Sequence, residues 1–143
     1  LNAENGMIDA AIKLGLEGLL LAEQSKNREA ISKATRGLGY FYYVAKNENK
    51  AAEFLEKAIK LCRESEDSAN LALSLYHNAR LDSYFGHKES AVAKMKEVIE
   101  IIENSRNSFA SQDLRSSFLS TKKQFYDFYI ELLIDLHKEK PIV

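Results

Sequence analysis

The sequence predicts an all-α protein, and three observations carry that prediction. Its 143 residues hold one proline and six glycines, too few chain breakers for an all-β fold of this length. Apolar residues recur at helical spacing, and no segment shows strand-like alternation. A shift of about 40 residues also superposes small and apolar residues, which indicates an internal repeat. We therefore expect an α-α superhelix of antiparallel helix pairs with a long C-terminal capping helix.

Six helices are expected, over residues 3–25, 28–46, 50–64, 69–85, 89–104 and 112–138. The first contains Gly15 and Gly18, and glycines inside a strong helix indicate close packing of another backbone. Ser68 is the expected N-cap of the fourth helix, and Gly86 supplies a left-handed stop after it. The sixth and longest helix follows a polar stretch and ends before Pro141.

The repeat is visible at three positions of the second helix of each pair. They form three series: Ala11, Ala51 and Ala91; Gly15, Leu55 and Met95; Gly18, Ala58 and Val98. The shared small–large–small phase fits a helix packed tightly between two others. The alternative, a six-helix bundle with accidental self-similarity, remains open at this point.

Composition excludes several classes of protein. A formal charge of −1 argues against a strongly basic nucleic-acid binder, and acidic and basic residues alternate as on a solvated helix face. A single cysteine, Cys62, excludes an internal disulfide framework and a cysteine zinc site. No apolar run is long enough to span a membrane, and the first residues lack the basic region, apolar core and cleavage site of a signal peptide, so we expect the cytoplasm as the simplest compartment. Because residue 1 is Leu1 rather than methionine, we interpret the chain as a fragment of a larger protein.

The pair over residues 28–66 resembles a tetratricopeptide repeat. Its first helix carries Leu38 and Gly39 with an aromatic residue, Tyr42, three positions later, and its second helix carries the alanine–large–alanine pattern described above. The pair over residues 69–105 is similar but departs from the pattern at Asn78 and Asp82. The resemblance implies one tetratricopeptide-like domain over residues 1–143, with 3–25 the second helix of a partial repeat and 111–139 the terminal helix. It implies a scaffold for protein binding.

The C-terminal quarter resembles the end of the repeat array that precedes a caspase-like CHAT domain in bacterial proteins. The matching features are Leu114-Arg115, Ser117-Phe118-Leu119, Tyr126, Tyr129-Ile130, Leu132-Leu133 and Leu136-His137. This resemblance implies that the chain is a regulatory or sensor arm whose peptidase domain lies downstream. It assigns no peptidase activity to the chain itself.

No catalytic, cofactor or metal site is expected. Cys62 lies at a core phase, where a small buried residue is more common than a nucleophile. His77, His87 and His137 lack metal-ligand spacing, and the Gly-Leu-Gly-Tyr segment lies within a helix rather than in a phosphate-binding loop. A self-contained enzyme is therefore the least favoured interpretation.

A concave groove lined by the first helix of each pair is the expected binding surface. By tetratricopeptide phase, the residues that project into it are Lys33, Arg36, Tyr40, Tyr43, Tyr76, His77, Arg80 and Tyr84. This set is aromatic and basic with no carboxylate, which suits a protein or peptide partner carrying an acidic or C-terminal carboxylate group. The alternative for several of the tyrosines is that they cover the neighbouring repeat or the last helix.

The last helix carries two adjacent apolar stripes. One consists of Phe118, Phe125, Tyr129, Leu132 and Leu136, and the other of Leu119, Tyr126, Ile130 and Leu133. We expect one stripe to pack on the fifth helix and the other to be exposed. Since the first helix is also unpaired on one side, homodimerisation through the terminal helices is a further prediction.

Overall fold

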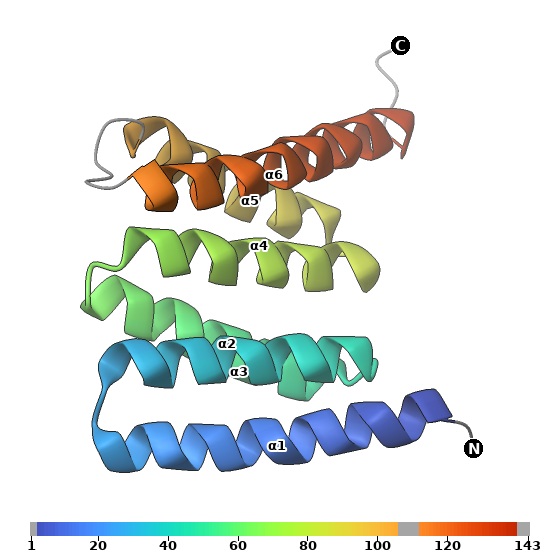
Figure 1. Ribbon diagram of the computed structural model, residues 1–143. Helices are drawn as coiled ribbons and strands as arrows, with labels where there is room; N and C mark the ends of the chain where they lie inside the picture. The colour runs from blue at the N-terminus through green and yellow to red at the C-terminus, as the bar shows by residue number, and fades with distance from the viewer. Residues whose placement is uncertain (1–2, 106–111, 140–143) are drawn as a thin grey trace.

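The computed structural model describes residues 3–105 and 112–139, with side chains described for 4–105 and 120–139. These residues form six helices: α1 (Ala3–Ser25), α2 (Arg28–Val44), α3 (Glu48–Glu64), α4 (Ser68–Tyr84), α5 (Lys88–Asn104) and α6 (Gln112–Glu139). The helices follow one another from α1 at one end of the stack to α6 at the other (Figure 1). Each packs against its neighbours in the chain, and α2 also contacts α4. The prediction of an all-α superhelix is confirmed.

The connections between helices set the repeat length. The helices α2 to α5 each have 17 residues and are joined by three-residue turns, so a helix begins every 20 residues and a pair every 40. The middle residue of each of these three turns has positive φ: Lys46 at 63°, Glu66 at 55° and Gly86 at 88°. In the two-residue turn between α1 and α2 the first residue, Lys26, has φ 56°. A left-handed residue of this kind ends a helix and turns the chain back.

Side chains in the turns then start the next helix. Asn27, Asn47 and Asp67 each accept a hydrogen bond from the backbone N–H three residues later, at 3.1, 3.1 and 3.2 Å. The predicted cap at Ser68 is therefore wrong by one residue, because the Asp67 carboxylate takes that role. The expected end of the second helix at residue 46 is also too late, because Lys46 adopts the left-handed conformation.

Glu66 offers a test of this turn geometry. It is exposed, and a side chain at positive φ costs about 1 kcal/mol that glycine does not incur. We expect Glu66→Gly to raise the free energy of unfolding by about 0.5–1 kcal/mol in urea titrations. Gly86→Ala, the matched change in the opposite direction, should lower it by about the same amount. A loss of stability in Glu66→Gly would contradict the turn assignment.

The two helices of a pair approach each other closely at one position. A Cβ built on Gly39 of α2 would lie 2.5 Å from Cγ and 3.2 Å from the backbone nitrogen of Leu55 on α3. In the second pair the equivalent residues are Ala79 and Met95. Leu55, Ala79 and Met95 are all fully buried. The flexible methionine accommodates the methyl group that the branched leucine excludes.

The glycines of the first helix differ from each other. A Cβ atom built on Gly15 would lie only 2.9 Å from Cδ2 of Leu38 on α2. The predicted role of Gly15 in close helix packing is therefore confirmed. Gly18 has no atom within 4 Å of its Cβ position and is exposed. The same prediction for Gly18 is therefore wrong for the described residues.

Two alanine substitutions in α2 should have opposite effects. Gly39→Ala should lower the free energy of unfolding by about 1–3 kcal/mol, since Leu55 cannot move away without shifting backbone. Gly37→Ala should raise it by about 0.5–1 kcal/mol, because that site is open and alanine favours the helix. Adding Leu55→Met to Gly39→Ala should recover part of the loss, as measured by urea unfolding of the double-mutant cycle. Equal effects of the two single changes would refute the close approach.

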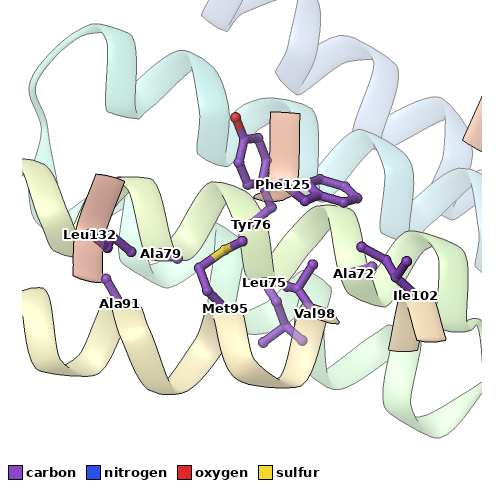
Figure 2. Close-up of a cluster of buried hydrophobic side chains, with 10 residues drawn as sticks. All are labelled: Ala72, Leu75, Tyr76, Ala79, Ala91, Met95, Val98, Ile102, Phe125 and Leu132. Atoms are coloured by element: carbon purple, nitrogen blue, oxygen red, sulfur yellow. The ribbon is translucent and has the colours of Figure 1, made fainter. Parts of the chain in front are cut away.

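The main core lies where α4, α5 and α6 meet (Figure 2). Its buried residues are Ala72, Leu75, Tyr76, Ala79, Ala91, Met95, Val98, Ile102, Phe125 and Leu132. The Tyr76 ring meets Phe125 of α6 edge-on at 4.9 Å between centroids. The last helix thus closes the stack by packing on both helices of the second pair.

The ends of the stack expose apolar side chains. On α6, Phe125 and Leu132 of the first predicted stripe are buried, whereas Ile130 and Leu133 of the second are 52% and 42% exposed. Phe118 and Leu119 lie outside the residues whose side chains are described. On α1 the exposed large residues are Met7, Leu14, Leu16, Leu20 and Leu21. None of the described helices has a window long and apolar enough to cross a bilayer.

Candidate functional site

The contact between α2 and α4 brings together most of the aromatic residues expected in the groove. The Tyr40 and His77 ring centroids are 5.3 Å apart, and those of Tyr43 and Tyr84 are 6.0 Å apart in an edge-to-face arrangement. Tyr40 and Tyr84 are 41% and 53% exposed. We call these four residues the aromatic face. They join two successive pairs, and the Tyr40 and Tyr84 rings remain accessible to a partner.

Tyr76 does not belong to this face. Its side chain is 7% exposed and its ring packs on Phe125 and Phe128 of α6. The alternative that some of the tyrosines cover the last helix therefore applies to Tyr76. Its hydroxyl still has a role, because it accepts a hydrogen bond from Arg80 at 3.1 Å.

The two predicted arginines, Arg36 of α2 and Arg80 of α4, both act electrostatically on His77. Arg36 donates to the side-chain oxygen of Asn70 at 2.9 Å, which links α2 to α4. The guanidinium of Arg80 lies 5.7 Å from the Tyr76 ring centroid and 5.9 Å from that of Phe128. A guanidinium has five N–H donors, so contacts of this kind can hold its position and still leave N–H groups for a ligand.

Lysines contribute unequally to the site. Lys33 is paired with Glu29 at 2.8 Å on the same helix, and both side chains are more than half exposed. Lys46, which the sequence analysis did not select, places its ammonium 4.0 Å from the Tyr84 ring centroid and 5.5 Å from that of Tyr43. Helical periodicity could not identify Lys46 as a site residue. It lies in the turn after α2, where that periodicity does not predict which way a side chain points.

The pKa of His77 is sensitive to burial and to the positive charges around it. Burial, together with the positive charges of Arg36 and Arg80, lowers the pKa of His77 from 6.5 to about 4. The imidazole is therefore neutral at physiological pH. A neutral imidazole near two guanidiniums adds no further positive charge to this region.

The lowered pKa predicts an acid-sensitive contribution to stability. The folded protein binds the His77 proton less readily than the unfolded chain does, so stability is complete above about pH 6.5 and is lost as pH falls toward 4. Between pH 7 and pH 4 we expect the wild type to lose roughly 2–3 kcal/mol more in free energy of unfolding than His77→Gln. Urea unfolding across this range measures the difference. His87→Gln, at an exposed turn, is the control and should behave like the wild type.

An apolar pocket adjoins the aromatic face. It has a volume of about 240 Å³ and is lined by Met7, Ile8 and Ala11 of α1 and by Tyr40, Phe41 and Val44 of α2. Tyr40 belongs both to this pocket and to the aromatic face. An aliphatic side chain of a bound segment would fit beside the ring.

Groups suited to covalent or metal chemistry are not gathered here. Cys62 is fully buried, and burial raises the pKa of its thiol, which keeps it protonated and unreactive. Within residues 3–105 and 112–139, no cluster of three or more histidine, cysteine or acidic side chains could hold a metal ion.

Comparison with known proteins gives one family. The model of the family described as anaphase-promoting complex subunit 5 matches residues 21–82 and again residues 70–125. Two successive matches to one family model are what an internally repeated chain produces. Among curated proteins, none matches the chain.

Proposed function

Because the chain belongs to the anaphase-promoting complex subunit 5 family, a family of tetratricopeptide-like helical repeats, we propose that it acts as a protein-interaction scaffold. The family is named for a subunit of a multiprotein complex, and assembly with other proteins is the role we infer for this chain. The proposed binding surface is the aromatic face together with Arg36, Arg80 and Lys46. Its proposed ligand is a peptide or protein segment with an acidic or C-terminal carboxylate group.

The observation that carries this proposal is uncompensated positive charge beside accessible aromatic rings. Among the described residues, no carboxylate lies within ion-pair distance of Arg36, Arg80 or Lys46. Asp67 acts on Arg36 at longer range, but its carboxylate accepts a hydrogen bond from Asn70 at 2.7 Å. An arginine held in place without an acidic partner is suited to bind a carboxylate from another molecule.

The neighbouring pocket adds a second requirement for the ligand. An aliphatic residue in the pocket beside Tyr40 would bury apolar surface, while the acidic group reaches the arginines across the aromatic face. We therefore propose a segment in which an aliphatic residue precedes the acidic group. The aromatic rings supply rigid contact area between these two anchors.

Binding of defined peptides tests this proposal. Fluorescent peptides ending in leucine and a free acidic C-terminus should bind, and amidated or leucine-to-serine versions should bind more weakly. Combined Arg36→Ala and Arg80→Ala should weaken binding at least tenfold, because each charge-assisted hydrogen bond contributes about 1.5–3 kcal/mol.

The control for that variant is Arg63→Ala, which removes an arginine from another surface. It should leave the affinity unchanged, and circular dichroism should show that all variants remain helical. Unchanged affinity in the double variant, measured by anisotropy or calorimetry, would reject the binding surface.

Two other roles rest on separate observations. Exposed apolar residues on α1 and α6 favour the proposed homodimer through the terminal helices. The resemblance of the C-terminal quarter to the array before a CHAT domain favours a regulatory arm of a caspase-like peptidase in the cytoplasm. Part of that segment, including Leu114-Arg115 and Ser117-Phe118-Leu119, lies outside the described side chains. The full reading frame decides this role: a downstream domain with a catalytic histidine and cysteine supports it.

A further inference from the structure

The first helix exposes a face that the equivalent helices bury. Forty residues after Leu14 and Gly18 lie Phe54 and Ala58 of α3. Phe54 stacks on Tyr42 of α2, with ring centroids 5.5 Å apart, and Ala58 is fully buried. On α1, by contrast, Leu14 is 66% exposed and a Cβ built on Gly18 would meet no atom within 4 Å. The side of α3 that α2 covers is therefore open on α1, which forms one end of the stack (Figure 1).

Large and small residues alternate along this side of α1. The large residues follow one another every seven positions, which is about two helical turns, and they are Met7, Leu14 and Leu21. All three are more than 60% exposed. Four positions after each lies a small residue, and these are Ala11, Gly18 and Ser25. Residues at this spacing share one side of a helix, and we call the six together the open face.

The open face is complementary to a copy of itself. In an antiparallel pair of α1 helices whose two-fold axis passes at the level of Leu16, every large residue lies opposite a small one. Leu14 then lies opposite the partner's Gly18. The other two layers pair Leu21 with the partner's Ala11 and Met7 with the partner's Ser25. Within the chain, Leu55 and Gly39 make the same kind of contact between α3 and α2.

Charged residues beside the open face fit the same pairing. Lys13 and Glu17 are exposed and lie one turn apart on one flank of α1. Neither forms an ion pair within the described part of the chain. Like flanks meet in an antiparallel two-fold pair, so Lys13 of each copy comes within reach of the partner's Glu17. Two symmetric ion pairs then favour this register over its neighbours.

We propose that the open face is a self-association surface, and that its partner is a second copy of this chain packed antiparallel on the same face. This inference rests on the proposed homodimer and deepens it, because it assigns the contact to α1 alone and gives its register. Pairing removes on the order of 1,000 Å² from water, the lower end of what specific interfaces bury. A two-fold contact is closed, so association stops at two chains.

Sedimentation velocity over a range of protein concentrations tests this surface. No peptide is present, because Ala11 also lines the pocket beside Tyr40. We expect a concentration-dependent dimer and no larger species. Leu14→Glu should weaken association at least tenfold, since it buries an unpaired carboxylate in the contact. Leu133→Glu, the matched change at an exposed leucine of α6, should leave it unchanged, with equal helix content by circular dichroism.

An exchange of charges tests the register separately from the apolar contact. Lys13→Glu and Glu17→Lys should each weaken the dimer about threefold or more, because each brings like charges together across the two-fold axis. The variant that carries both changes should regain the wild-type affinity, because the ion pairs form again in the opposite sense. Equal weakening in the single and double variants would contradict the register.

The possible results separate the occupants of the open face. A wild type that stays monomeric at every concentration would overturn the proposal and leave a helix of another protein as the occupant. Growth beyond two chains, or association that Leu133→Glu abolishes and Leu14→Glu does not, would overturn it in favour of a contact through α6, with the homodimer itself retained in the second case. Peptide binding at the aromatic face is measured independently and affects none of these results.

Discussion

The close contact between the two helices of a pair is the constraint on which the rest of the structure depends. In the first pair α2 and α3 meet where Gly39 leaves room for Leu55, and in the second Ala79 meets the more adaptable Met95. Turns of three residues with a left-handed middle residue repeat this contact every 40 residues. Since the separation and register of the helices are fixed in this way, α2 and α4 present equivalent positions along one face.

Much of this fold can be predicted from the sequence because apolar period and small residues determine helix packing directly. The alanine–large–alanine series at Ala51, Leu55 and Ala58 corresponds to fully buried residues. Helix ends were less predictable, because Lys26, Lys46 and Glu66 take a left-handed conformation that glycine usually signals. Of the expected site residues, Tyr76 lies under α6. Its contact with Phe125 joins segments far apart in the chain, which helical phase cannot anticipate.

The repeated helix pairs carry different polar groups at two places, the α2–α4 face and the contact between α3, α4 and α5. On the α2–α4 face, arginines and Lys46 lie beside aromatic rings with no ion-pair partner in the described part of the chain, and this arrangement supports the proposed binding of an acidic segment. At the contact between α3, α4 and α5, the ion pair of Asp82 and Lys94 takes the positions that the stacked rings of Tyr42 and Phe54 hold in the first pair. Because the backbone repeats, side-chain exchange at equivalent positions is enough to change the chemistry of a surface. This property suits a scaffold for protein binding.

The pKa of His77 in the presence of a bound acidic peptide tests the central claim most directly. In the free protein the two neighbouring guanidiniums and burial hold that pKa at about 4. A carboxylate bound between Arg36 and Arg80 would offset their charge, so the account predicts that the pKa of His77 rises toward 6.5 when NMR titration is repeated with saturating peptide. A pKa that stays at about 4 in the saturated complex would contradict the claim that the acidic group binds at this face.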